Sequence, residues 1–117
     1  MKYKQLLSHL NISQLNEMQQ ASIDAINRMS DVQLISPTGS GKTLAFLLPI
    51  TDLLNAERQG VQAMIVVPSR ELAIQIEQVF KQLKTNFKVN CCYGGHNVRI
   101  EKNSLQPAPA LLIGTPG

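Results

Sequence analysis

The stretch Ser36-Pro37-Thr38-Gly39-Ser40-Gly41-Lys42-Thr43 decides the fold, because it joins a short apolar run to a longer helical one. Residues 32–35 before it predict the end of a buried strand, and the residues from Leu44 onward predict an amphipathic helix. The glycines let the backbone curl so that successive N–H groups face an anion, and the following helix adds the positive end of its dipole. Lys42 would then reach the β- and γ-phosphates, and the Thr43 hydroxyl would ligate Mg²⁺. This stretch therefore predicts a nucleoside triphosphate site.

The stretch departs at one position from the strict pattern G-x-x-x-x-G-K-[ST], because Ser36 stands where the pattern has its first glycine. A small residue still fits that turn, so we interpret the stretch as a variant of the pattern. The alternative is a glycine-rich turn followed by a lysine that merely caps a helix. The intact Gly-Lys-Thr, with an expected strand before it and a helix after it, favours phosphate binding.

Length and composition place the chain among globular domains. Its 117 residues suffice for one domain at most, and 44% hydrophobic with 16% charged residues argues against disorder. A net charge of +3 permits contact with nucleic acid but does not require it, because the basic residues are scattered. Without an apolar leader or a run long enough to span a bilayer, we expect a cytoplasmic protein.

The two cysteines, Cys91 and Cys92, are adjacent. Neighbouring side chains on a strand point to opposite faces, so these two are poor disulfide partners for each other. Since no histidines stand nearby at metal-ligand spacing, we expect buried, reduced thiols and no metal site there.

The pattern along the chain alternates between helices and strands. Asn16 and Gln19 have the spacing of a capping box at the start of a helix over 16–29, and Ser69 is expected to cap a later helix. The other expected elements are a helix from Thr43 toward Leu54 with a bend at Pro49, a strand at 63–67 covered on both faces, strands at 89–93 and 110–113, and a short polar helix at 96–106. This order predicts an α/β fold with right-handed crossovers and a mainly parallel sheet. Ligands of such sheets bind beyond the carboxyl ends of the strands.

Four motifs in the order and spacing seen here resemble those of the DEAD-box RNA helicases. The stretch 36–43 resembles motif I, Pro68-Ser69-Arg70-Glu71-Leu72-Ala73 resembles motif Ia, Gly94-Gly95 resembles the paired glycines, and Thr115-Pro116-Gly117 resembles motif Ib. The resemblance covers nearly the whole chain. It implies that residues 1–117 form the N-terminal portion of a RecA-like P-loop NTPase domain, truncated and without the second domain.

The resemblance also implies an ATP site that uses Mg²⁺. Its nucleotide-binding residues would be Gln19, Thr38, Gly39, Ser40, Gly41, Lys42 and Thr43, with Lys42 and Thr43 as the catalytic pair. Gln19 lies where the family's glutamine reads the adenine edge, although the residues alone favour a plain capping-box role for it. The surrounding region departs from the family pattern, with Leu15 in place of proline and Asn16 in place of threonine or serine.

A second surface implied by the resemblance binds RNA through its sugar–phosphate backbone. Its residues would be Ser69, Arg70, Gly94, Gly95, Thr115, Pro116 and Gly117. Helix N-termini and exposed backbone N–H groups suit such contacts, which carry no base sequence. Taken alone, the glycine pair and the Thr-Pro-Gly run are also ordinary turn signals, and Arg70 could be a surface ion-pair partner.

Parts that hydrolysis requires are absent from this stretch. The chain ends at Gly117, before any Asp-Glu-Ala-Asp or Ser-Ala-Thr motif. Of its eight carboxylates, only Glu71 lies just beyond the carboxyl end of an expected strand, and we interpret it as structural because it begins a helix. We therefore expect a truncated chain without appreciable ATPase activity, from a parent that couples ATP hydrolysis to local RNA strand separation. The alternatives are a P-loop kinase and a non-catalytic, nucleotide-dependent RNA-binding module.

Overall fold

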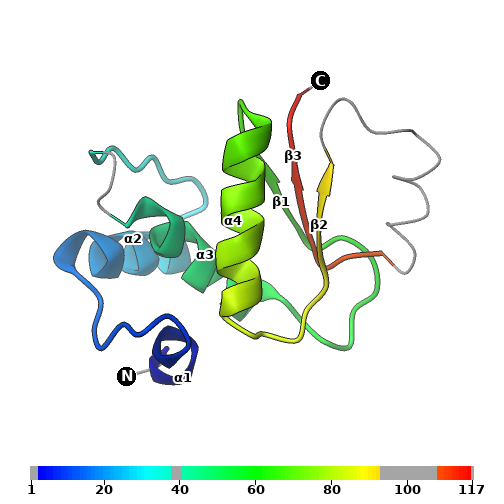
Figure 1. The fold of residues 1–117 in the computed structure, drawn as a ribbon. Coiled ribbons are helices and arrows are strands. Elements are labelled where there is room, and N and C mark those ends of the chain that lie inside the picture. The colour runs from blue at the N-terminus through cyan, green and yellow to red at the C-terminus, as the bar shows by residue number, and fades with distance from the viewer. Residues whose placement is uncertain (1–2, 38–40, 93–107, 117) are drawn as a thin grey trace. The chain divides into compact units, whose positions relative to one another are not determined.

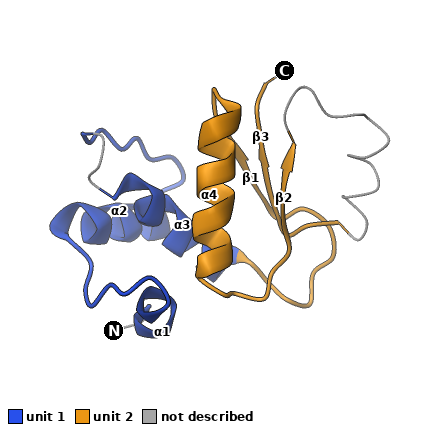
Figure 2. Cartoon of the chain, viewed as in Figure 1, with its two compact units in different colours: residues 1–53 blue, residues 54–117 orange. Residues whose placement is uncertain are grey.

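The computed structural model of the chain describes residues 3–37, 41–92 and 108–116 (Figure 1). These residues fall into two compact units, an N-terminal unit of residues 1–53 and a C-terminal unit of residues 54–117 (Figure 2).

Helices make up the regular structure of the N-terminal unit. They are α1 (Lys4–Ser8), α2 (Glu17–Arg28) and α3 (Lys42–Leu53). At the start of α2 the Asn16 side chain accepts a hydrogen bond from the Gln19 N–H at 2.8 Å, and the Gln19 side chain accepts one from the Asn16 N–H at 3.0 Å. The predicted capping box is therefore confirmed.

Helices α2 and α3 pack against each other. The buried Ser22 hydroxyl on α2 donates a hydrogen bond to the Ala45 carbonyl on α3 at 3.0 Å. Helix α3 continues past Pro49 to Leu53, as predicted, because an internal proline removes one backbone hydrogen bond without ending the helix. Near the N-terminus the buried Tyr3 hydroxyl donates to the Asp52 carboxylate. Burial and the Asp52 carboxylate together raise the pKa of Tyr3.

The strand expected just before the phosphate-binding stretch is absent, so that prediction was wrong. Residues 31–37 have no regular structure, and the Val32 and Ile35 side chains are 40% and 86% exposed. A strand needs a neighbour that satisfies its backbone N–H and C=O groups, and no described strand pairs with this segment. Local apolar character was therefore not enough to make a strand here.

The C-terminal unit contains a parallel sheet of three strands, which confirms the predicted α/β fold class. The strands are β1 (Ala63–Val66), β2 (Val89–Cys92) and β3 (Leu111–Gly114), in the order β1-β3-β2. Residue Leu112 of β3 pairs with Met64 of β1 and with Asn90 of β2, so the last strand in sequence lies at the centre. Because β3 sits between them, the two earlier strands do not pair with each other.

Helix α4 (Arg70–Gln82) covers one face of this sheet. The Ser69 side chain accepts a hydrogen bond from the Leu72 N–H at 3.2 Å, so the predicted cap is confirmed. The core of this unit includes Phe80 on α4 and Leu111 and Ile113 on β3, each at most 1% exposed. These side chains bury the apolar surface that holds helix and sheet together.

The opposite face of β1 is open, which contradicts the expectation that this strand is covered on both faces. Met64 and Val66 are 63% and 62% exposed, and they alternate with less exposed neighbours. Side chains alternate between the two faces of a strand, and α4 is the one described helix of this unit that covers the sheet. The apolar run thus predicted the strand but not its surroundings.

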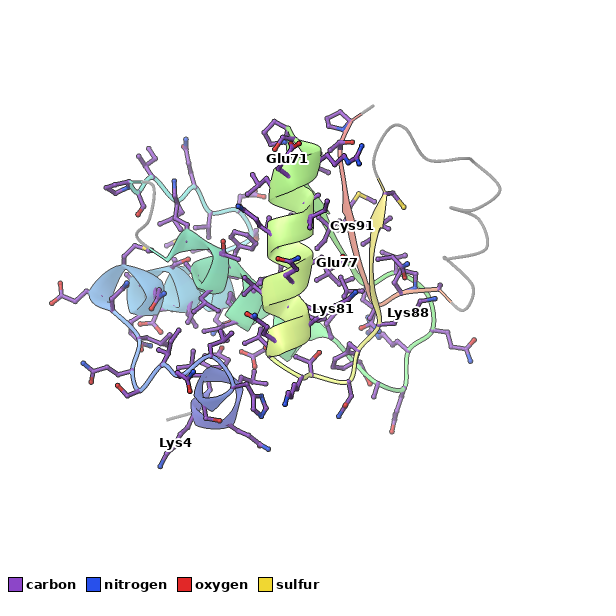
Figure 3. The ribbon with its side chains drawn as sticks, in the orientation of Figure 1. Lys4, Glu71, Glu77, Lys81, Lys88 and Cys91 are labelled. Atoms are coloured by element: carbon purple, nitrogen blue, oxygen red, sulfur yellow. The ribbon has the colours of Figure 1, made fainter. Side chains whose placement is uncertain are left out.

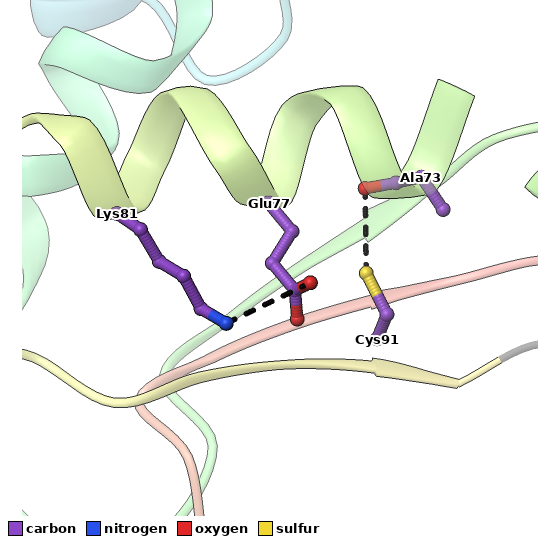
Figure 4. Close-up of polar contacts among 4 residues, drawn as sticks. All are labelled: Ala73, Glu77, Lys81 and Cys91. Carbon is purple, nitrogen blue, oxygen red and sulfur yellow. Dashed lines mark hydrogen bonds and ion pairs between the residues drawn. The ribbon is translucent and has the colours of Figure 1, made fainter. Parts of the chain in front are cut away.

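Both cysteines are reduced thiols outside any disulfide, and each is half-buried instead of fully buried as expected. The Cys91 thiol donates to the Ala73 carbonyl of α4 at 3.3 Å, close to the ion pair between Glu77 and Lys81 at 3.8 Å (Figure 4). Burial and the nearby Glu77 carboxylate raise the pKa of Cys91 to about 12. This thiol is therefore protonated and unreactive at neutral pH.

Strands β2 and β3 confirm the expected strands at 89–93 and 110–113, up to shifts of one residue at their ends. The expected helix at 96–106 lies outside the described residues. Among the residues that are described, no helix is long and apolar enough to cross a membrane.

Candidate nucleotide and nucleic-acid sites

Gly41, in the stretch predicted to bind phosphate, has a left-handed backbone conformation. Its φ is +88°, in the left-handed region where a Cβ atom is strained, and α3 begins at the next residue, Lys42. A Cβ placed on Gly41 would lie 2.4 Å from the Gln19 Nε2 atom. The backbone conformation therefore favours glycine here, and a Cβ would in addition displace the end of the Gln19 side chain.

Gln19 links the start of α2 to this turn. Its Nε2 donates a hydrogen bond to the Gly41 carbonyl at 3.2 Å, while its Oε1 accepts the Asn16 N–H at 3.0 Å. The side chain is 6% exposed, so its orientation is fixed by both bonds. The capping-box role favoured by the residues alone is confirmed, and the bond to Gly41 is an additional contact.

No pattern in the sequence indicated the bond between Gln19 and Gly41. The two residues are separated by 22 positions, and no periodic pattern relates a helix start to a loop that far along the chain. The signal that pointed to Gln19 was its place three residues after a capping asparagine.

The first turn of α3 presents the groups that would face a phosphate. The first backbone N–H groups of any α-helix have no carbonyl acceptor within the helix, because each N–H bonds the carbonyl four residues earlier. In α3 the Ala45 N–H donates to the Gly41 carbonyl at 3.4 Å. The predicted residues Lys42 and Thr43 are the first two of this helix, and both are half-buried. Thr38, Gly39 and Ser40 lie outside the described residues.

In the C-terminal unit, two of the predicted RNA-binding segments lie at the same edge of the sheet. The Val67 N–H after β1 donates to the Gly114 carbonyl at 2.9 Å, and the Thr115 N–H after β3 donates to the Cys92 carbonyl at 3.1 Å. Ser69 and the exposed Arg70 start α4 directly after β1, so they share this carboxyl edge with Thr115 and Pro116 (Figure 1). Gly94, Gly95 and Gly117 lie outside the described residues.

A parallel sheet with a flanking helix, together with a Gly-Lys-Thr helix start, defines the class of P-loop proteins with a RecA-like fold. The family follows from comparison of the sequence: the model of the DEAD/DEAH box helicase family matches residues 16–117. This chain belongs to that family.

Relatives and solved structures agree with the family match. The chain is 38% identical to the ATP-dependent rRNA helicase RRP3 of Encephalitozoon cuniculi, over 91% of this chain and 27% of that protein. It superposes on a hypothetical ATP-dependent RNA helicase from Sulfolobus tokodaii with a TM-score of 0.83 and 28% identity, covering 99% of this chain and 34% of the other. The DEAD-box helicase Mss116, solved with single-stranded RNA and UDP-BeF, gives a TM-score of 0.83 at 31% identity, covering 98% and 25%.

The chain spans only about a quarter of the curated relative RRP3, at 27% of its length. Its relatives are named as RNA helicases, which favours the helicase interpretation over the P-loop kinase.

Proposed function

We propose that residues 1–117 are the N-terminal portion of the first RecA-like domain of an ATP-dependent RNA helicase. This portion carries a Q-like motif, motifs I and Ia, the paired glycines and part of motif Ib. In the whole protein it binds ATP and RNA, and ATP hydrolysis is coupled to local separation of an RNA duplex. Support comes from the family membership of the chain and from the names of its relatives.

The observation that carries this proposal is the geometry at Gly41. A left-handed glycine, immediately followed by the first turn of a helix, turns backbone N–H groups toward one point. Partial positive charge at that helix end and the Lys42 ammonium group suit the triphosphate of a nucleotide. The proposed nucleotide-binding residues are Gln19, Thr38, Gly39, Ser40, Gly41, Lys42 and Thr43.

Gln19 retains the capacity to read adenine in addition to its structural bonds. Its amide group has two N–H donors and two acceptor lone pairs. The bond to the Gly41 carbonyl uses one donor, and the bond from the Asn16 N–H uses one lone pair. One donor and one lone pair remain, which match the N7 acceptor and N6 donor of adenine.

Lys42 and Thr43 are the proposed catalytic residues. The Lys42 ammonium group would offset negative charge that develops on the terminal phosphates. Thr43 would supply one hydroxyl ligand to Mg²⁺, and its place in the first turn of α3 fits a ligand that also contacts phosphate. The metal would neutralise phosphate charge when it is bound.

The proposed RNA-binding surface is the carboxyl edge of the sheet in the C-terminal unit. It comprises Ser69, Arg70, Gly94, Gly95, Thr115, Pro116 and Gly117. The Ser69 hydroxyl accepts the Leu72 N–H and keeps its own hydrogen for a phosphate oxygen. Because Arg70 is exposed at the positive end of α4, charge and dipole act in the same direction on an RNA phosphate.

The test uses the full-length protein and measures ATP hydrolysis with and without RNA, together with separation of a short RNA duplex. The variant Lys42→Ala should lower RNA-stimulated hydrolysis by about a hundredfold, since it removes a charge that stabilises the transition state. The exposed Lys4 on α1 offers a matched control, and Lys4→Ala should leave both activities unchanged.

Three results would contradict the proposal. Full activity of the Lys42→Ala variant would place the phosphate site elsewhere. Binding of ATP and RNA without strand separation by the wild type would favour the non-catalytic binding module. Phosphoryl transfer to a small molecule, without RNA binding that weakens with salt, would favour a kinase.

The isolated 117-residue chain is expected to show no appreciable ATPase activity.

A further inference from the structure

A pocket of about 560 Å³ lies in the C-terminal unit, at the edge of the sheet opposite to the proposed RNA surface. The segments that enter the three strands form it, so it faces their amino ends. Lys88, which lines the pocket, directly precedes β2, whereas Glu71 lies in the first turn of α4, after the carboxyl end of β1 (Figure 3). The pocket is therefore distinct from the proposed RNA surface, and it shares no residue with the proposed nucleotide site.

The lining of the pocket is polar and carries positive charge. Arg58 and Lys88 contribute two cations, and none of the twelve lining residues is acidic. Amide and hydroxyl side chains line much of the rest, and the half-buried Phe87 adds an aromatic ring. This combination disfavours a metal cation, for lack of carboxylates, and disfavours a purely apolar ligand.

Hydrogen bonds hold the walls of the pocket in place. The Gln62 side chain accepts the Asn55 N–H at 2.7 Å and donates to the Asn55 carbonyl at 2.9 Å, which closes the loop before β1. On the loop before β2, the Thr85 hydroxyl accepts the Phe87 N–H at 3.3 Å, so the hydroxyl hydrogen is left to donate. The Lys88 carbonyl accepts the Ala110 N–H at 2.9 Å and ties this loop to the segment before β3.

We propose that this pocket binds one nucleotide unit as a phosphate ester. Arg58 and Lys88 would contact the phosphate, the Phe87 ring would stack on the base, and the surrounding amides would contact base and sugar polar atoms. The volume lies within the range of about 300–1,000 Å³ that is usual for small-molecule sites. The unit is either a free nucleotide or the end of an RNA strand, because both present the same phosphate and base. The proposal does not depend on the function assigned to Lys42.

Binding is measured by calorimetry on the full-length protein carrying Lys42→Ala, which takes the lysine charge away from the nucleotide site proposed above. The probes are uridine 5′-monophosphate, uridine and inorganic phosphate. We expect the monophosphate to bind at least about tenfold more tightly than either part alone, because only it engages both the cations and the ring.

Matched variants separate the pocket from general charge effects. Arg58→Gln and Lys88→Gln should each weaken binding of the monophosphate by about three- to tenfold, and Phe87→Leu should weaken it to a similar extent. Lys81→Gln removes the same charge from the same unit outside the pocket and should have no effect. Lys88→Gln keeps the backbone carbonyl that accepts the Ala110 N–H, and its far-ultraviolet circular dichroism spectrum checks that the fold is retained.

Absence of binding at millimolar monophosphate, or equal weakening by Lys81→Gln and Lys88→Gln, would overturn the proposal. A 5′-phosphorylated oligouridylate that binds more tightly than the mononucleotide, with the gain lost in Lys88→Gln, would identify the end of an RNA strand as the ligand of the pocket. Equal affinities would identify the free nucleotide.

Discussion

Replacing Gly41 with alanine tests whether the turn before α3 is held by the Gln19 side chain. The new Cβ would have a backbone φ of +88° and would lie 2.4 Å from the Gln19 Nε2 atom. Gly60 provides a matched control, because its φ is +89° and nothing lies within 4 Å of a Cβ placed there. The two substitutions share the backbone strain and differ in the steric clash.

The expected magnitudes follow from these contacts. A left-handed conformation costs an alanine about 1–2 kcal/mol, and this is the whole expected loss for Gly60→Ala. In Gly41→Ala the Gln19 amide must also move away, which breaks its bond to the Gly41 carbonyl and disturbs the one from the Asn16 N–H. Each bond contributes about 0.5–1.5 kcal/mol, so Gly41→Ala should lower the free energy of unfolding by about 2–5 kcal/mol.

The assay is urea unfolding of the variants, with the slope on denaturant used to check that they unfold alike. The double variant Gln19→Ala with Gly41→Ala completes a mutant cycle. Once the Gln19 amide is gone, the further cost of Gly41→Ala should fall to that of Gly60→Ala. Equal losses for Gly41→Ala and Gly60→Ala in the wild-type background would refute the proposed steric role of Gln19.

Other residues give shorter tests. Asn16→Ala removes the cap of α2 and should cost about 1 kcal/mol in urea unfolding, with no loss if the capping box is not formed in solution. Ser69→Ala should lower the free energy of unfolding by a similar amount and, in the full-length protein, should also weaken RNA binding. Lower stability with unchanged RNA binding would argue against the proposed RNA contact. Cys91, whose pKa is raised to about 12 from 9.0, should resist iodoacetamide at pH 8.5 until urea unfolds the chain. As the pH rises, the unfolded thiol ionises before the folded one. The stability that the raised pKa of Cys91 contributes is therefore present below pH 9 and is lost as the pH rises from 9 toward 12. Rapid labelling in the absence of urea would contradict that burial. Ile113→Ala in the fully buried core should cost about 2–5 kcal/mol, and a loss below 1 kcal/mol would show that α4 does not pack on the sheet as described.

The sequence alone determined the features that depend on neighbouring residues. The capping box of Asn16 and Gln19, the cap of α4 at Ser69 and the strands β1, β2 and β3 were all predicted, because local hydrogen-bonding and apolar patterns specify them. The motifs were likewise local, and they indicated the family before any comparison.

Only the tertiary structure decided which apolar segments find partners. Residues 32–35 carry the pattern of a strand but pair with no described strand, and β1 leaves Met64 and Val66 exposed although its apolar run predicts two covered faces. The bond between Gln19 and Gly41 and the pocket around Lys88 likewise join positions far apart in the chain. Strand pairing, burial and such contacts depend on which surfaces meet in space, and a local pattern of residues does not encode that.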